Sequence, residues 1–590
     1  MDEATKLPIG PEEVAEAAQI LQRYKAGKAA LDKRLVDNEL WFRMGHWKNY
    51  QNPMMEGKPQ PSSGWLFNSI ANKHADAMDN YPSPNVLPRA EDDEAAAQAL
   101  SSVLPVVLEQ ADYEQVYSDT WWRKLKQGTG VKGVFWDSEQ RGGVGEIAIR
   151  PMNLLMLYWE PGVDDIQTSP HFFSLSLADT AQLESRWPQL AGHTASVLDV
   201  PHYIHDGGLD TSDKSVVVDW YYKKPLPDGG TALHLIKFTG RDLLYASEND
   251  PAMAGGFYPH GQYPVVFDVL YPEAGTPCGF GMIAVSKDPQ QYIDRLSGNL
   301  LEMSMKASTP RFWVKKGCGV NAQEFLDWSK PLVEVEGSID DERLRQISLY
   351  NLDGQWVNML QLKIDELKET SNSRDVTQGS VSGGVTAASA IAALQEASGR
   401  SSRAATRSAY RAYARMIRMV IERIRQFYDL PRKFRILGAG GAEEYVSYCN
   451  AHLKAQSLGA DGLLRTPVFD VTVTTQKHTE YTKLAQNELA LQFFQLGFFR
   501  PGMEQQALAC LDMMDFDGKE QVLQKIRGGT QDALWQRMAL TLAQRYEPEL
   551  FASLTDSAQG MRADVRLEGE KAPAQVRQAR KRAAEAAQPE

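Results

Sequence analysis

A row of four arginines is the most regular arrangement of potentially functional side chains in this sequence. Arginine recurs every four residues of a predicted helix, at Arg403, Arg407, Arg411 and Arg415. This spacing puts the guanidinium groups on one slowly drifting helix face. Such a face can contact nucleic acid, or it can form salt bridges between helices or subunits. Because the chain has a formal net charge of −13, we favour the salt bridges.

One histidine pair has spacing compatible with metal binding. His202, His205 and Asp206 form an HxxHD motif, and imidazole and carboxylate groups are ordinary zinc ligands. A surface turn before Gly207 and Gly208 explains the same residues, and we favour that interpretation. We therefore expect no metal, no cofactor and no catalytic residue.

Catalytic signatures are missing from the sequence. It contains no GxxxxGK followed by Ser or Thr, no HExxH and no GxSxG, and no GxGxxG follows a predicted strand. A nuclease or packaging ATPase needs a carboxylate cluster for two metal ions or a phosphate-binding loop. We therefore expect a protein that is not an enzyme, and a nucleic-acid-processing enzyme is the weaker alternative.

Length and composition indicate a large folded protein of several modules. The chain has 590 residues, of which 43% are hydrophobic and 24% charged, so one compact core is too small for it and general disorder is excluded. The negative net charge argues against wrapping nucleic acid over the general surface, because that binding requires many Lys and Arg contacts to phosphate. Any contact with DNA must be local or transient.

The four cysteines and the N-terminal residues bear on the cellular compartment. Cys278, Cys318, Cys449 and Cys510 form no CxxC pair, which is typical of a protein from a reducing compartment. The first residues lack the basic and apolar regions of a signal peptide, and no apolar run approaches the ~20 residues of a membrane helix. We expect assembly in the cytoplasm and no membrane contact.

The first 280 residues have the pattern of a mixed α+β body. Helical spacing of apolar residues predicts helices over 11–50, 65–80 and 92–126. The prolines at Pro82 and Pro84 are expected to stop the second helix. Alternation in VKGVFWD and GEIAIR, separated by Arg141, Gly142 and Gly143, predicts a β-hairpin, followed by short strands and turns up to residue 280.

Long helices dominate the middle of the chain. We predict helices over 288–308 and 354–372, separated by an insert at 311–352 with strands in RFWVKK and PLVEVEG. A Gly/Ser loop then leads into a long helix over 386–428, which Gly399 should weaken. Strands in KFRIL, EYVSYC and FDVTVTT are expected to rejoin the first body, and helices follow from residue 481.

This layout resembles the portal proteins of tailed double-stranded DNA bacteriophages. The likeness is carried by NELWFRMGHW, DTWWRKLKQGTGVKGVFWD, NLLMLYWEPGVDDIQTSPHFF, CGFGMIAVSKDPQQYIDRLSGNLLEMSMKASTPRFWVKKG and GGVTAASAIAALQEASGRSSR. It extends in order over residues 30–480. The last hundred residues carry no motif of the family.

The resemblance implies an elongated α+β portal fold with long helices, built of wing, stem, clip and crown modules that form a ring. Its modules are the wing (1–280), stem helix 1 (281–310), the clip (311–352), stem helix 2 (353–375), the tunnel loop (376–387), a long kinked helix (388–430), further wing strands (431–480) and a crown with a C-terminal helical region (481–590).

The resemblance also implies which residues meet DNA and partners. The channel and tunnel loop would contain Lys363, Lys368, Arg374, Gln378, Ser380, Val381, Ser382, Gly383 and Gly384. The partner surface of the clip would contain Arg311, Trp313, Lys315 and Lys316, although Trp313 can equally belong to a core. A solvated stem surface for the cations and an ordinary helix connection for the loop remain open.

The function implied is a channel at one capsid vertex through which DNA enters during packaging and leaves during ejection. The expected partners are further copies of the chain in a dodecamer, double-stranded DNA bound without sequence preference, terminase, the major capsid protein and tail adaptor proteins. The protein would be found in the virion. A structural adaptor of the virion without a channel is the main alternative.

Overall fold

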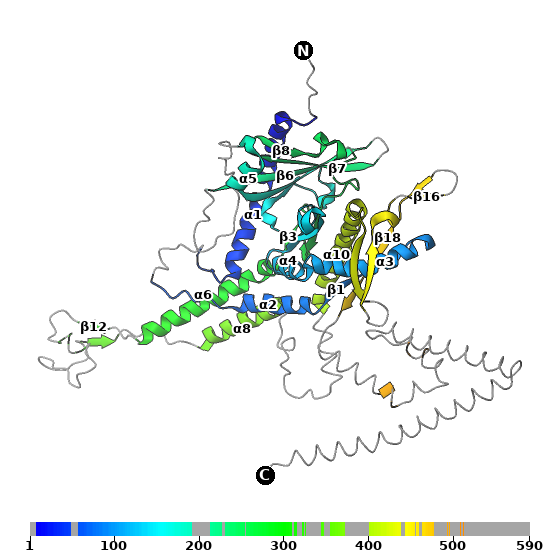
Figure 1. The fold of residues 1–590 in the computed structure, drawn as a ribbon. Helices are drawn as coiled ribbons and strands as arrows, with labels where there is room; N and C mark the ends of the chain where they lie inside the picture. The colour runs from blue at the N-terminus through cyan, green and yellow to red at the C-terminus, as the bar shows by residue number, and fades with distance from the viewer. Residues whose placement is uncertain are drawn as a thin grey trace, which may run out of the picture. The chain divides into compact units, whose positions relative to one another are not determined.

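The computed structural model describes most of the chain up to residue 476. The described residues are 8–48, 57–190, 213–226, 230–253, 255–308, 312–314, 321, 323, 325, 344–346, 354–371, 400–437, 443–454, 456–458, 463–476, 492–493, 495, 508 and 511. The chain divides into two compact units, the first Met1–Ile436 with Glu444–Lys477 and the second Leu437–Glu443 with His478–Glu590. Nearly all described residues belong to the first unit (Figure 1).

A five-stranded antiparallel sheet packs against the N-terminal half of helix α1 (Pro11–Phe42). Its strands, in spatial and chain order, are β4 (Leu157–Trp159), β5 (His171–Asp179), β6 (Lys214–Pro225), β7 (Thr231–Thr239) and β8 (Asp242–Ala246). Successive side chains of a strand point to opposite faces. Accordingly Phe173 packs with Tyr24 of α1, whereas Phe172 packs with Tyr263 on the other face. Both faces are buried in the middle of the sheet, so consecutive apolar residues occur there, as in Val216, Val217 and Val218 of β6.

A second sheet contains the hairpin predicted from VKGVFWD and GEIAIR. Its order is β3 (Glu146–Met152), β2 (Thr129–Asp137) and β9 (Val265–Val269), all antiparallel. Val134 pairs with Ile149, and Asp137 pairs with Glu146 at the turn end. The hairpin prediction is confirmed.

Helices from distant parts of the sequence pack on this second sheet. α4 (Tyr113–Gln127) and α10 (Arg400–Phe427) contact its strands, whereas α2 (Trp65–Met78) packs on α4 and α10, and α3 (Glu94–Gln110) packs on α4 and on the strand Tyr81–Pro88. The short α5 (Thr180–Arg186) lies beside the first sheet. The predicted helix over 92–126 is therefore two helices. Asp112 separates them with a positive φ of 49°, a conformation that an α-helix cannot continue.

The prolines after α2 lie in a strand. The helix ends at Met78 as predicted, but Tyr81–Pro88 forms β1, which pairs antiparallel with β18 (Phe469–Gln476). The Val86 backbone N–H donates to Ser101 Oγ in α3 at 3.0 Å instead of to β18. Pro82, Pro84 and Pro88 share the parity of Val86, so their missing N–H groups cost no ladder hydrogen bond.

The predicted middle helices are present. α6 (Met282–Ser308) begins six residues before its predicted start and contains Pro289, and α8 (Gly354–Thr370) matches its prediction. The two helices pack side by side (Figure 1). Between them in sequence, β12 (Phe312–Val314) pairs with β13 (Leu344–Gln346). RFWVKK thus contains a strand, whereas PLVEVEG lies outside the described residues.

The remaining described strands form short pairs. They are β10 (Tyr271–Pro272) with β11 (Gly279–Phe280), β14 (Arg432–Leu437) with β15 (Glu443–Tyr448), and β16 (Gln456–Leu458) with β17 (Leu463–Arg465). The predicted strands in KFRIL, EYVSYC and FDVTVTT are therefore confirmed. Among the residues that the structure describes, no helix has the length and apolar character needed to cross a bilayer.

Gly128 ends α4 and gives a test of this fold. Its φ is +91°, and a Cβ atom there would overlap the backbone of Phe280, just before α6. We expect Gly128→Ala to lower the free energy of unfolding by roughly 2–4 kcal/mol, because left-handed strain and a backbone clash add. Gly142→Ala, at φ +66° with open space around it, should cost about 1 kcal/mol. Equal losses in chemical denaturation of the two variants would contradict the close approach of α4 and β11.

Candidate functional site

A buried polar cluster fixes the first half of α6 to the body. Asp294 Oδ2 lies 2.5 Å from His46 Nδ1, and His46 Nε2 lies 3.1 Å from the Trp41 carbonyl oxygen. Asp294 Oδ1 accepts hydrogen bonds from Ser63 N, Ser63 Oγ and Gln290 Nε2. Both ring nitrogens of His46 lie within hydrogen-bond distance of an oxygen, and both carboxylate oxygens of Asp294 are hydrogen bonded. Removing one partner would leave buried polar atoms without a hydrogen bond, which is costly.

The far ends of α6 and α8 expose an apolar surface. Met282 of α6 and Ser371 after α8 line the same pocket, so the helices run antiparallel and the end of α6 lies beside the start of α8. The large apolar side chains exposed there, with exposed fractions from 41% to 68%, are Leu301, Met305, Trp356, Val357, Met359 and Leu362. In α8 the buried side chain is Leu367, near the body. Six exposed large apolar side chains on one short helix pair exceed the single scattered residues of an ordinary surface, and clustered exposed apolar side chains often belong to interaction sites.

The α6–α8 pair is close to electrically balanced. Its sequence contains five Lys and Arg residues and six Asp and Glu residues. Lys363 Nζ forms an ion pair with Glu366 at 2.6 Å and lies 5.4 Å from the centre of the Tyr292 ring. Lys368 Nζ lies 5.7 Å from the centre of the Trp65 ring. Two of the three predicted channel cations, Lys363 and Lys368, are thus on α8.

The other predicted channel residues cannot be placed in the same way. Lying outside the described residues are Arg374, Gln378, Ser380, Val381, Ser382, Gly383 and Gly384. In the predicted partner surface, Trp313 of β12 is 68% exposed, so it is not a core residue within the described chain. Arg311, Lys315 and Lys316 lie outside the described residues, as do His202, His205 and Asp206. The described ranges contain no group of three or more candidate metal ligands.

Helix α10 separates an apolar face from a basic face. Its buried side chains include Tyr413, Met416, Ile417, Val420 and Ile424, which lie in the largest core of the first unit. The predicted arginine row is exposed on the other face, and Arg418 extends it. Ile421 is buried on the same apolar face as Ile417.

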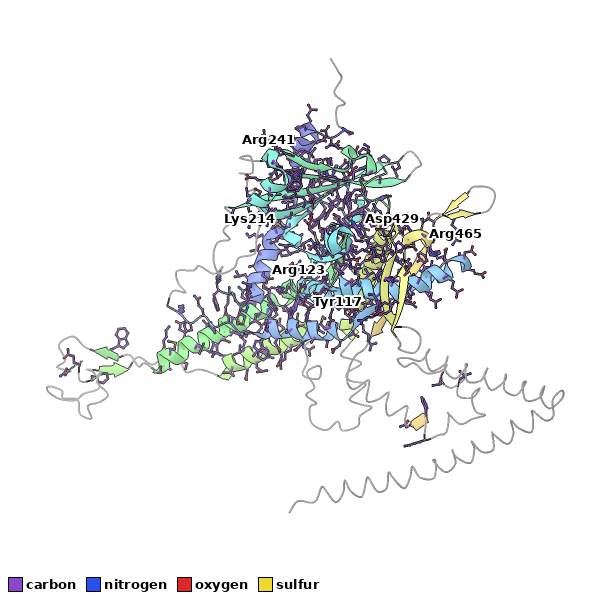
Figure 2. The ribbon with its side chains drawn as sticks, in the orientation of Figure 1. Tyr117, Arg123, Lys214, Arg241, Asp429 and Arg465 are labelled. Carbon is purple, nitrogen blue, oxygen red and sulfur yellow. The ribbon has the colours of Figure 1, made fainter. Side chains whose placement is uncertain are left out.

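Two lysines are buried beneath α10. Lys124 Nζ donates to Asp268 Oδ1 at 2.6 Å and to the Ala405 carbonyl of α10 at 3.1 Å. Lys132 Nζ donates to the Tyr113 hydroxyl at 3.0 Å, and its ammonium lies 5.5 Å from the centre of the Tyr117 ring, which is labelled in Figure 2. Desolvation lowers the pKa of Lys132 to about 8, against a smaller opposing effect of Asp268. This cluster ties α4, β2 and β9 to α10.

A third buried cation, Arg423, lies near the C-terminal end of α10. Its guanidinium stacks on Tyr258, and Nη1 lies 2.8 Å from His260 Nε2. Desolvation, reinforced by Arg423, lowers the pKa of His260 to about 3, so His260 is neutral and accepts this hydrogen bond. Sequence reasoning missed Lys124, Lys132 and Arg423. A signal was available, because Lys124 and Arg423 fall at apolar-periodic positions of their helices.

Comparison with known proteins now decides the family. The family model described as phage P22-like portal protein matches residues 231–586, which is more than half of the chain. The chain belongs to the P22-like phage portal protein family. No curated protein matches it. The family is structural, and its members act at the capsid vertex in DNA packaging.

The family match covers a different part of the chain from residues 30–480, over which the sequence resembles portal proteins. It covers α6, β12, β13, α8 and α10 of this portal protein, together with residues 481–586. No short family motif was found in the last hundred residues, and the match extends over most of them because a whole-family pattern detects weak positional preferences that no short motif displays. The match begins at β7, so it does not include the N-terminal residues in which we also saw a likeness.

Lys132 makes the stability of this portal protein depend on pH. Below about pH 8 both folded and unfolded chains carry its proton, so the cost of burying the charge is fully present. Between about pH 8 and 10.5 the unfolded chain binds more protons, so the free energy of unfolding rises with pH. We compare the free energy of unfolding of Lys132→Met with that of wild type. We expect the difference, variant minus wild type, to be larger at pH 7 than at pH 9.5 by on the order of 1–2 kcal/mol.

Urea denaturation of both proteins at the two pH values measures this difference. The tyrosines are common to both proteins, so their titration cancels to first order. Lys33→Met, at an exposed position of α1, serves as the control. Its free energy of unfolding should differ from that of wild type by the same amount at both pH values. An offset for Lys132→Met that does not change with pH would contradict burial of the ammonium group.

Proposed function

We propose that this portal protein assembles in the host cytoplasm into a dodecameric ring and acts without catalysis as a conduit for DNA. The ring surrounds a channel through which double-stranded DNA enters the capsid and later leaves it. The observation that carries this proposal is the apolar surface at the far ends of α6 and α8. A single copy leaves this surface in water, whereas neighbouring copies in a ring bury it.

The charge balance of α6 and α8 supports passage of DNA without strong binding. A sliding polyanion is held back by every phosphate that a cation neutralises. Five cations against six acids, with Lys363 paired to Glu366, give a surface with little net attraction. We assign Lys363 and Lys368 to the channel side, with Arg374 and the loop 376–387 at its narrow part.

The strand pair β12–β13 is proposed as the docking surface for terminase and tail adaptor proteins. Trp313 supports this assignment, since an exposed tryptophan is a frequent anchor of protein interfaces. Arg311, Lys315 and Lys316 would supply polar contacts around it. Contact with the major capsid protein is assigned to the body that contains the two sheets.

We keep the module boundaries expected from the resemblance as part of this proposal. In it, α6 belongs to stem helix 1 (281–310), α8 to stem helix 2 (353–375), and β12 and β13 to the clip (311–352). The wing would comprise 1–280 and 431–480, and the pairing of β1 with β18 supports joining these two segments. Residues 388–430 would be the connecting helix, and 481–590 the crown and C-terminal region.

Leu362 offers the most direct test of the apolar surface. Its side chain is 68% exposed, so Leu362→Asp should change the stability of one copy by less than about 0.5 kcal/mol. In the ring, the same change buries a carboxylate in an apolar contact. We expect native mass spectrometry to show the ring fraction falling by about tenfold or more.

Leu362→Met is the matched control, because it keeps the position apolar and should assemble like wild type. Unfolding curves of unassembled protein exclude a folding defect in both variants. Normal assembly of Leu362→Asp would contradict burial of this surface between copies.

A further inference from the structure

The arginine row of α10 remains without a role in the proposed channel. From here on the arginine row means Arg407, Arg411, Arg415 and Arg418, all exposed on the face opposite the core; Arg403 is left out because it has an interaction of its own. Within the described ranges, Arg407, Arg411 and Arg415 form no ion pair or hydrogen bond. Like charges at successive helical turns repel each other. Arg418 lies close enough to Asp470 to contribute to lowering the pKa of that carboxyl. A chain of net charge −13 therefore exposes three arginines without an ion pair to another described residue, and an anionic surface can neutralise them.

The C-terminal end of the row opens into a groove. Arg415 and Arg418 line one side of a space of about 710 Å³, with Val468 and Phe469 also in its wall. Its lining includes the apolar residues Val265, Phe267 and Met419 and the carboxylates Asp164, Asp165 and Glu422. The groove thus presents cations, carboxylates and apolar side chains together, a mixture that suits a folded protein surface better than a bare polyanion.

An acidic surface lies on the opposite side of α10. We define the acidic corner as Glu109, Asp112 and Glu114, at the junction of α3 and α4, where they line a second groove of about 230 Å³. The Glu109 and Glu114 side chains are exposed and form no ion pair with another described residue. Tyr413 reaches this groove from α10. Tyr413 follows Arg411 by two residues, a turn of about 200° around the helix.

A closed ring of identical copies needs two different surfaces that fit each other. A head-to-tail contact joins one surface of each copy to the second surface of the next. The row and the corner meet this requirement, because they carry opposite charge and lie on opposite sides of one helix. We propose that the arginine row of one copy binds the acidic corner of the next copy. This inference rests on the proposed ring. It adds the charged contact that determines which surfaces of two neighbouring copies face each other.

Charge exchange between the two surfaces tests this contact. One variant carries Arg411→Glu and Arg415→Glu, and the other carries Glu109→Lys and Glu114→Lys; Asp112 is retained because of its positive φ. In each variant alone, like charges oppose each other at every contact, so the ring fraction should fall at least about tenfold. An equimolar mixture should restore rings in which the two variants alternate, with equal numbers of each in native mass spectra.

Lys33→Glu with Arg241→Glu is the matched control, since it changes the net charge as the first variant does. Lys33 is exposed on α1, and Arg241 lies at the turn before β8 (Figure 2). This control should assemble like wild type. Circular dichroism and melting of all variants establish that each is folded.

Three results would overturn the contact. Normal assembly of either exchanged variant alone would show that its surface lies outside the interface, and a mixture that fails to assemble would show that the two surfaces are not partners. Rings of the arginine variant that form normally but lose retention of duplex DNA would assign the row to DNA. Failure of the wild-type chain to form a ring is a different outcome, because it removes the proposed channel itself.

Discussion

The apolar face of α10 is the constraint on which the rest of the described structure depends. Its side chains pack against α2, α4, β1, β2, β9 and β18, elements that are far apart in the sequence. Burial of this face fixes the direction of the opposite face, which carries the arginine row. The packing that stabilises the body therefore also sets the position of this basic surface.

Buried cations beneath α10 give this packing its specificity. An apolar core tolerates sliding between a helix and a sheet, whereas Lys124 must reach both Asp268 and the Ala405 carbonyl. Arg423 fixes the position of the helix a second time through its contacts with Tyr258 and His260. Each such group is costly to bury and still more costly to leave unpaired. The same logic holds for Asp294 and His46, which orient α6 at its base and leave its far end free for neighbouring copies.

Local patterns allowed much of the fold to be predicted. The helices α6, α8 and α10 and the β2–β3 hairpin follow from periodicity and turn residues that act over short distances. β1 could not be predicted in this way, because its partner β18 is nearly four hundred residues away and three prolines hide its strand character. The exposure of Trp313 was likewise undecided, since alternation alone does not tell which face of a strand pair is covered.

Less of the candidate site than of the fold could be predicted from the sequence. The helix pair and its cations could be placed, but the apolar surface at its far end became visible once the packing of α6 on α8 showed which side chains remain exposed. Lys124 and Lys132 were missed because lysine is ordinarily a surface residue. Their burial depends on Asp268 and Tyr113, partners that tertiary structure brings together.

Electron microscopy of the purified wild-type protein at moderate salt, combined with its native mass, tests the central claim most directly. The account predicts a closed ring of about a dozen copies around a hole wide enough for duplex DNA, about 20 Å or more. A compact dimer or tetramer without a central hole would contradict it.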